Sequence, residues 1–198
     1  MHNLMKTPDG FWDIPELFSH INFNRSAGSK TTGLMLSSLV FSNDVQVALD
    51  IGIFNGFTTQ CLGWSMACNA GPDATLFSID IGEVCCKIAR DCSIPVDHRI
   101  ICADTMTLDF EKLLDGKMLD LAFIDGDHSY PGEYNDIAKV KPFLKDSGIM
   151  VVHDYNYGLP EVMRAVADNF DFSKYDKFII KERGNSADIQ SVIIQKKS

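Results

Sequence analysis

The sequence lacks the cysteine spacing of a structural zinc site or a disulfide framework. None of its six cysteines forms a CxxC pair, and Cys85 and Cys86 are adjacent. Zinc modules and disulfide-rich domains need regularly spaced cysteines, so this pattern disfavours both. We expect reduced thiols that serve as small apolar packing groups.

Long apolar runs and an excess of positive charge are also missing. No stretch approaches the ~18 apolar residues of a membrane span, and no basic segment followed by an apolar one opens the chain. The formal net charge of −9 disfavours a nucleic-acid backbone or an anionic membrane as partner, since both attract clustered lysine and arginine. These absences predict a soluble, cytoplasmic protein that binds a small molecule, with no nucleic-acid or membrane partner.

From about residue 45, short β-rich segments alternate with longer amphipathic ones. Strands that are apolar on both faces and separated by helices indicate a parallel sheet covered on both sides. We expect strands at 45–51, 74–81, 98–104, 119–125, 148–155, 177–183 and 191–197. Helices are expected near 57–69, 83–92, 107–115, 131–144 and 159–169.

The last two strands have only a short turn, GNSAD at 184–188, between them, so they should form a hairpin. The pattern predicts an α/β, doubly wound, mostly parallel seven-stranded sheet with a C-terminal antiparallel hairpin strand. The 198 residues fit one domain, 1–198. Within it, 1–44 would be an N-terminal helical cap or lid with a helix at 29–41, and 45–198 the ligand-binding core.

Each of the first five predicted strands ends on an aspartate. Ligands of open parallel sheets bind at the carboxyl ends of the strands, beside the point where the strand order reverses. Single acids are common in polar loops, but five at one edge indicate a site. The residues are Asp50, Asp80, Asp104, Asp125 and Asp154.

The loop after the first strand carries two glycines suited to a close ligand approach. Gly52 allows a tight turn, and Gly56 lets backbone approach a ligand at the start of the next helix. A dinucleotide fingerprint, GxGxxG, needs its middle glycine where Phe54 stands, and its third glycine is also missing, which disfavours an NAD(P)-dependent oxidoreductase. The loop therefore suits a nucleoside without phosphates, although a purely structural turn also explains it.

Two further acids suit a nucleoside. Asp80 lies where an acid can bind two ribose hydroxyls, and Asp104 could accept from the exocyclic amine of adenine. A helix N-cap is the other reading of Asp104.

The stretch FIDGDHSY ends an apolar run with crowded negative charge. Asp125 and Asp154 close adjacent strands, so their hard oxygen ligands could hold Mg²⁺, Mn²⁺ or Ca²⁺. A solvated acidic loop is the alternative. A phosphatase built on the pair Asp125 and Asp127 is disfavoured, because such enzymes carry this pair on the first strand.

In this order, DIGIFNGFTT, SIDI, CADT, FIDGDHSY and VVHDY resemble the class I S-adenosylmethionine-dependent methyltransferases. More narrowly, residues 29–198 resemble the metal-dependent O-methyltransferases, including those that modify sugars and macrolide-type natural products. The resemblance implies a Rossmann-like fold in which the glycine loop holds the methionine part of the cofactor, Asp80 the ribose, and Asp104 lies near adenine. The implied cofactor residues are Asp50, Gly52, Phe54, Asn55, Gly56, Thr58, Asp80, Ile81, Asp104, Thr105 and Asp125.

The same resemblance implies that Asp125 and Asp154 bind a divalent cation, for which Mg²⁺ is the expected ion. It also implies that Asp125 and His128 are catalytic residues, with His128 as the general base. The chain departs from the pattern of many relatives, which carry an acid before the second metal aspartate or an asparagine after it. His153 is the expected third ligand, with Asp127 and Asn156 as alternatives. On an intact strand, His153 and Asp154 would point to opposite faces.

The sequence thus predicts an S-adenosylmethionine-dependent O-methyltransferase that acts on a hydroxyl of a small molecule such as a sugar, phenol or natural product, assisted by Mg²⁺. The alternative is a catalytically inactive S-adenosylmethionine-binding protein. Few residues remain to build a deep acceptor pocket, so we expect an open site or one completed by a second subunit of a homo-oligomer.

Overall fold

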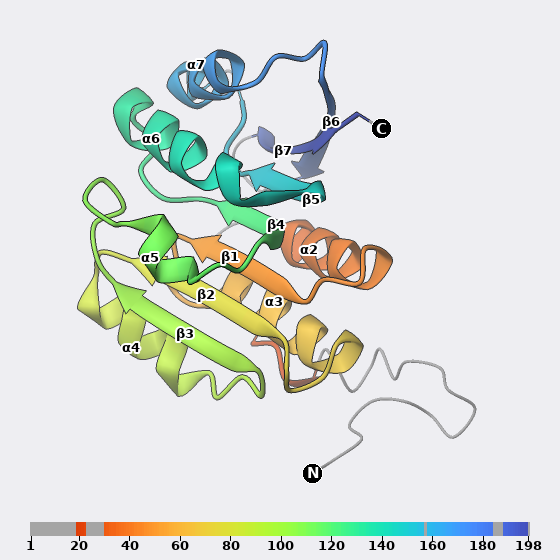
Figure 1. The fold of residues 1–198 in the computed structure, drawn as a ribbon, viewed down its shortest axis with the longest axis vertical. Coiled ribbons are helices and arrows are strands. Elements are labelled where there is room, and N and C mark those ends of the chain that lie inside the picture. Colours follow the sequence, from red (N-terminus) through yellow and green to blue (C-terminus); the bar gives the residue numbers. More distant parts are fainter. Residues whose placement is uncertain (1–18, 23–29, 157, 184–187, 198) are drawn as a thin grey trace.

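The computed structural model describes residues 19–22, 30–156, 158–183 and 188–197, and it contains the predicted alternation (Figure 1). The helices are α2 Lys30–Ser42, α3 Phe57–Asn69, α4 Glu83–Asp91, α5 Phe110–Leu114, α6 Tyr130–Val140 and α7 Pro160–Asn169, with a 3₁₀ turn, η2, at Lys141–Phe143. The strands are β1 Val47–Ile51, β2 Thr75–Asp80, β3 Asp97–Cys102, β4 Leu119–Ile124, β5 Leu144–Val152, β6 Tyr175–Arg183 and β7 Asp188–Lys196.

These strands form one sheet in the order β3-β2-β1-β4-β5-β7-β6. The pairs among β1 to β5 are parallel, and β7 runs antiparallel between β5 and β6. The predicted doubly wound sheet with an inserted antiparallel strand is therefore confirmed. The strand order reverses between β1 and β4, which puts the expected ligand crevice at their carboxyl ends.

Apolar side chains cover both faces of the sheet, as the strand composition predicts. On one face, Leu36 of α2 and Leu62 of α3 pack with Phe123 of β4. On the other, Leu114 of α5 and Ile137 of α6 belong to the core that also includes α7. Helices thus lie on both sides of the sheet (Figure 1).

Three elements begin or end at other residues than the sequence predicts. The helix expected at 107–115 is shortened to α5, because the Asp109 carboxylate accepts from the Lys112 amide and caps it there. The helix expected to reach residue 144 ends as α6 at Val140, followed by η2, which contains Pro142. β5 begins at Leu144 rather than 148 and ends at Val152, before His153.

The expected N-terminal helix is α2, which packs against α3. The rest of the predicted cap, apart from residues 19–22 and 43–44, lies outside the described residues, as does most of the turn at 184–188. Among the helices of the described part of the chain, none has the length and apolarity to cross a membrane.

Candidate active site

A pocket of about 780 Å³ lies at the carboxyl ends of β1 to β5. Seven of the eleven residues expected to bind the cofactor line it: Gly52, Phe54, Asp80, Ile81, Asp104, Thr105 and Asp125. Three residues expected at the chemical end, His128, His153 and Asp154, line the same pocket. The structure therefore joins the two halves of the predicted site in one cavity.

Gly52 brings the glycine loop against the loop that follows β4. Its φ of +95° is one that residues with a side chain rarely adopt, and a Cβ there would collide with the Asp125 carbonyl oxygen. The Gly52 amide donates to the Ile79 carbonyl at 2.9 Å, and the Asp125 amide donates to the Ile51 carbonyl at 2.9 Å. The ends of β1, β2 and β4 are therefore fixed together at this glycine.

Asp80 stabilises the rim of the pocket on the β2 side. Its carboxylate accepts from the Phe54 amide at 3.0 Å and from the Gly82 amide at 2.8 Å. The Phe54 side chain is 64% exposed and Ile81 is 73% exposed, so both present apolar surface at the pocket. An acid between two exposed apolar side chains is suited to a ligand with a polar sugar and a flat apolar ring.

Asp104 forms a turn at the end of β3 and is not a helix N-cap. Its carboxylate accepts from the Met106 amide at 2.9 Å, whereas the N-cap of α5 is Asp109. Lys139 of α6 stabilises the same turn through hydrogen bonds from its ammonium to the carbonyls of Thr105 and Met106, at 2.9 and 2.7 Å. Sequence reasoning missed Lys139, because nothing local links it to residues more than thirty positions earlier.

The other four expected cofactor residues, Asp50, Asn55, Gly56 and Thr58, do not line the pocket. Asp50 is fully buried, and its carboxyl accepts from the Thr59 hydroxyl at 2.5 Å and the Thr58 hydroxyl at 3.5 Å. Burial raises the pKa of Asp50 to about 7. Asp50 therefore contacts two hydroxyl groups at the start of α3, and its direct contact with a cofactor stays a prediction.

Gly56, with a φ of +76°, starts α3, and the Asn55 side chain accepts from the Phe57 amide at 3.3 Å. Both residues thus shape the loop that leads into the N-terminus of α3, and neither lines the pocket.

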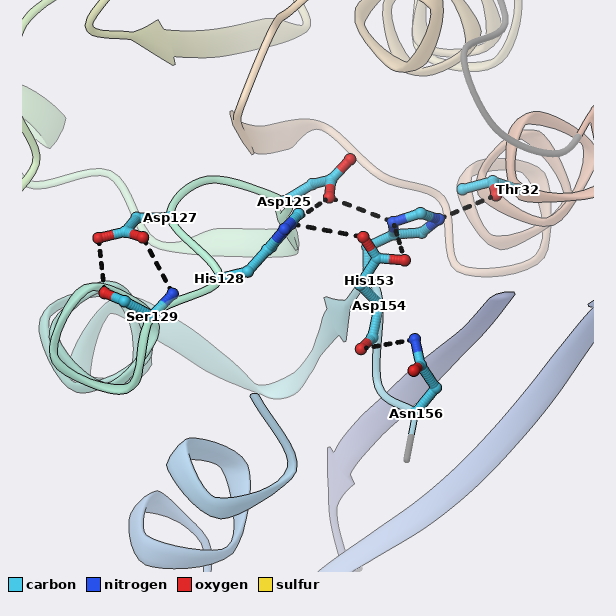
Figure 2. Close-up of polar contacts among 8 residues, drawn as sticks. All are labelled: Thr32, Asp125, Asp127, His128, Ser129, His153, Asp154 and Asn156. Atoms are coloured by element: carbon cyan, nitrogen blue, oxygen red, sulfur yellow. Dashed lines mark hydrogen bonds and ion pairs between the residues drawn. The ribbon is translucent and has the colours of Figure 1, made fainter. Parts of the chain in front are cut away.

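Two aspartates and two histidines meet at the other end of the pocket (Figure 2). His128 Nε2 lies 3.2 Å from Asp125 Oδ1 and 3.5 Å from Asp154 Oδ2. His153 Nδ1 lies 3.1 Å from Asp125 Oδ1 and 3.6 Å from Asp154 Oδ1. Each imidazole therefore bridges the same two carboxylates.

The histidines compensate the charge of the acidic stretch. Burial works to raise the pKa of Asp125, but hydrogen bonds from His128 and His153 outweigh it and hold that pKa below its usual value. The hydrogen bond to Asp125 raises the pKa of His128. Burial alone would lower the pKa of His153, but its hydrogen bonds to Asp125 and Asp154 raise it to about 10.

The convergence of His153 and Asp154 depends on the early end of β5. The strand ends at Val152, and Asp154 has a left-handed φ of +53°. Both side chains therefore turn toward Asp125 (Figure 2), because the strand, which would have pointed them to opposite faces if intact, has already ended. Asp154 is fixed in this turn because its carbonyl accepts from the Asn156 amide at 2.9 Å and the Asn156 side chain at 3.1 Å.

The structure also separates the three candidates for a third cation ligand. Asp127 accepts from the Ser129 amide and hydroxyl at 2.9 and 2.7 Å, and Asn156 bonds to backbone, so both stabilise local turns. His153 contacts Asp125 through Nδ1 and the Thr32 hydroxyl of α2 through Nε2, at 3.4 Å. In the described part of the chain, the donor atoms that converge within 4.8 Å belong to Asp125, His128 and Asp154.

This donor set fits a divalent cation. In an octahedral site, two neighbouring ligand atoms each lie about 2.1 Å from the cation, at right angles, and therefore about 3.0 Å from one another. His128 Nε2 lies 3.2 Å from Asp125 Oδ1 and 3.5 Å from Asp154 Oδ2, which is close to this spacing. Two carboxylates favour Mg²⁺ or Mn²⁺. The imidazole nitrogen that converges with them is that of His128, whereas the expected third ligand was His153.

A search of curated proteins finds no match. Solved structures do match: an O-methyltransferase from Bacillus cereus in complex with SAH is 14% identical, with a TM-score of 0.68 over 85% of this chain and 82% of that one. TomG from Streptomyces achromogenes, an O-methyltransferase of tomaymycin synthesis in complex with SAM, is 16% identical, with a TM-score of 0.67 over 86% and 81%. An rRNA methylase from Streptococcus thermophilus is 14% identical, with a TM-score of 0.65 over 85% and 95%.

These likenesses establish the fold. The model of the methyltransferase domain family matches residues 49–155, more than half of the chain and the stretch that runs from β1 to the turn after β5. That stretch contains the glycine loop, both nucleoside-side acids and the aspartate–histidine cluster. The chain belongs to the methyltransferase domain family.

Proposed function

We propose that this methyltransferase transfers the methyl group of S-adenosylmethionine to a hydroxyl oxygen of a small molecule, assisted by a divalent cation. The observation that carries the proposal is the single pocket with two chemically distinct ends. One end offers Asp80, Asp104 and exposed apolar side chains. The other offers the cluster of Asp125, His128 and Asp154.

The nucleoside end suits S-adenosylmethionine. A volume of about 780 Å³ is within the range of small-molecule sites. Adenosine would cover the exposed surfaces of Phe54, Ile81 and Met106, while its ribose lies within reach of Asp80. Similar structures from Bacillus cereus and Streptomyces achromogenes contain SAH and SAM, which supports this cofactor.

The chemical end suits activation of a hydroxyl group. Asp125 and Asp154 would hold the cation, which supplies polarisation of the acceptor hydroxyl and lowers its pKa. With the cation on the two carboxylates, His128 Nε2 would no longer donate to them and could take the hydroxyl proton as the oxygen attacks the sulfonium methyl. The new O–CH₃ bond replaces the S⁺–CH₃ bond, and the cofactor leaves as the neutral thioether.

His153 would position Asp125 rather than react. It is 9% exposed, and its ring contacts Asp125 on one side and Thr32 on the other. A ring fixed at both nitrogens orients the carboxylate that binds the cation.

A small-molecule acceptor is favoured over RNA, although an rRNA methylase is among the similar folds. The net charge of −9 opposes binding to a phosphate backbone. We propose sugars, phenols and related natural products as acceptors, bound in an open site or one completed by a second subunit.

Calorimetry with S-adenosylmethionine and with NAD⁺, followed by methyl-transfer assays over a panel of hydroxyl compounds with EDTA, Mg²⁺ or Mn²⁺, tests the proposal. We expect S-adenosylmethionine binding and cation-dependent transfer. Asp125→Ala should abolish cation-dependent turnover and leave cofactor affinity within about threefold, roughly 0.7 kcal/mol. Binding without transfer to any acceptor would favour the inactive binding protein, and no binding would refute the proposal.

A further inference from the structure

Asp136 of α6 is a buried acid that lines the pocket and has no part in the chemistry above. It is 1% exposed, and it forms the pocket wall together with Thr105, Met106 and Gly126. Burial raises the pKa of Asp136, whereas hydrogen bonds from Thr105 and Asn135 lower it. A further donor from a ligand would therefore favour the ionised carboxylate, which accepts hydrogen bonds.

Two contacts fix the direction of the Asp136 carboxylate. The hydroxyl of Thr105, in the turn after β3, donates to it. A Cβ on Gly126, in the loop after β4, would lie 3.1 Å from Asp136 Oδ2, so this oxygen faces the backbone at a position without a side chain. Thr105 and Gly126 both line the pocket, so the carboxylate itself lies at the pocket wall.

α6 fixes this part of the wall through two further side chains. Asn135 Nδ2 donates to Asp136 Oδ1 at 3.3 Å. Lys139 donates to the carbonyls of Thr105 and Met106. Thr105 thus contacts α6 through both its hydroxyl and its carbonyl. The carboxylate and the turn after β3 therefore keep a fixed relative position, which recognition of one ligand edge requires.

The nucleoside end of the pocket offers acceptors to a ligand. Among the described residues that line the pocket, none is a lysine or an arginine, and Asp80, Asp104 and Asp136 lie at this end. A ligand here must therefore supply hydrogen-bond donors. In adenosine these donors are the ribose hydroxyls, for which Asp80 is proposed, and the exocyclic amine of the base.

Asp136 suits this amine better than Asp104. Asp104 is exposed, and its Oδ1 accepts from the Met106 amide at 2.9 Å. A base that covers Met106 has an edge close to Thr105, and so to the carboxylate that Thr105 contacts. A hydrogen bond to a buried carboxylate is also stronger than one for which water competes.

We propose that Asp136 determines the base specificity of the site by accepting a hydrogen bond from the exocyclic amine of adenine. Thr105 and Asn135 keep the carboxylate oriented. Hypoxanthine, which has a carbonyl oxygen in place of the amine, would bring two acceptor oxygens together and leave the carboxylate without this donor. The inference rests on the nucleoside cofactor of the proposed function and not on the cation.

S-Inosylhomocysteine, which has hypoxanthine in place of adenine, tests this role. In titration calorimetry of the full chain without added cation, the wild type should bind SAH at least about 100-fold more tightly than S-inosylhomocysteine. Asp136→Asn should bind SAH about tenfold more weakly than the wild type. It should bind S-inosylhomocysteine about tenfold more tightly, because the asparagine amide can donate to the hypoxanthine carbonyl. A destabilised fold cannot produce such a gain in affinity.

Three further variants serve as controls. Asp104→Asn changes the other candidate acceptor and should keep most of the preference for SAH. Asp91→Asn removes an exposed carboxylate at the end of α4, which pairs with Lys87, and should leave both affinities unchanged. Asp136→Ala offers neither acceptor nor donor and should bind the two ligands with affinities within about threefold. It replaces Asp136→Asn if that variant does not fold.

The outcomes separate this inference from the proposed function. A wild type that binds both ligands equally, or an Asp136→Asn variant that keeps the wild-type preference, would overturn the role of Asp136 while leaving S-adenosylmethionine binding intact. Loss of the preference in Asp104→Asn alone would also overturn it and assign the amine to Asp104. A wild type that binds neither ligand would refute the proposed function itself.

Discussion

Replacing Gly52 with alanine should weaken both ends of the pocket at once. At a φ of +95° an alanine is strained by about 1–2 kcal/mol. Its Cβ would also collide with the Asp125 carbonyl oxygen, a backbone atom that cannot rotate away, and overpacking of this kind costs about 1–3 kcal/mol. Together these effects predict a loss of about 2–5 kcal/mol in the free energy of unfolding.

Gly71 provides a matched control. Its φ is +82°, but a Cβ there would meet nothing within 4 Å, so Gly71→Ala carries the strain without the collision. Urea unfolding should therefore show a loss of about 1–2 kcal/mol for Gly71→Ala and a larger one for Gly52→Ala.

Ligand binding distinguishes a displacement of the two loops from a general loss of stability of the fold. Calorimetry should show weaker S-adenosylmethionine and Mn²⁺ binding for folded Gly52→Ala, because the glycine loop and the Asp125 loop must move apart. Gly71→Ala should bind both normally. Equal stability losses in the two variants, or loss of only one ligand in Gly52→Ala, would refute the reasoning that this contact couples the two loops.

Three further substitutions probe single groups. Burial raises the pKa of Asp50 from 3.8 to about 7, so between these pH values the native protein holds a proton that the unfolded chain has released. The contribution of Asp50 to the free energy of unfolding therefore falls as pH rises from about 4 to 7. Urea unfolding at pH 5 and 8 should show Asp50→Asn stabilised at the higher pH, by up to about 4 kcal/mol; lost cofactor binding would instead show a direct contact. His128→Asn should lower kcat by about 10²- to 10⁴-fold with unchanged S-adenosylmethionine affinity, whereas a main loss in Mn²⁺ affinity would make His128 a ligand. Lys139→Met should weaken S-adenosylmethionine binding by roughly tenfold in calorimetry, because it releases the turn after β3, and should leave Mn²⁺ affinity unchanged.

The fold could be predicted because its signals are local. Each strand and helix is recognisable from its own residues, and the alternation fixes the parallel sheet and the hairpin. The helix at 57–69 matches the expected range, since Gly56 marks its start. Element ends were less predictable, because they depend on side-chain caps such as Asp109 and on where the ladder of β5 stops at Val152.

The site was predictable in position but not in detail. Acids at strand ends are visible in the sequence, and four of the five line one pocket. The pairing of His153 with Asp125 is not visible, because it requires the left-handed turn at Asp154. Lys139 matters only through residues brought close by packing, which no local pattern encodes.

The aspartates at this edge show why the partner decides the role of an acid. Asp50 faces two hydroxyl groups in an apolar interior, so burial dominates and its pKa rises to about 7. Asp80 faces backbone amides and fixes the shape of a loop. Asp125 faces two imidazoles, which outweigh burial and keep it ionised, so it alone of these three combines negative charge with donors that a cation can replace. Aspartates at the same topological position thus have three roles, which depend on the donors that the neighbouring strands and helices supply. Asp50 stabilises the glycine loop, Asp80 fixes the rim of the pocket, and Asp125 is a candidate cation ligand.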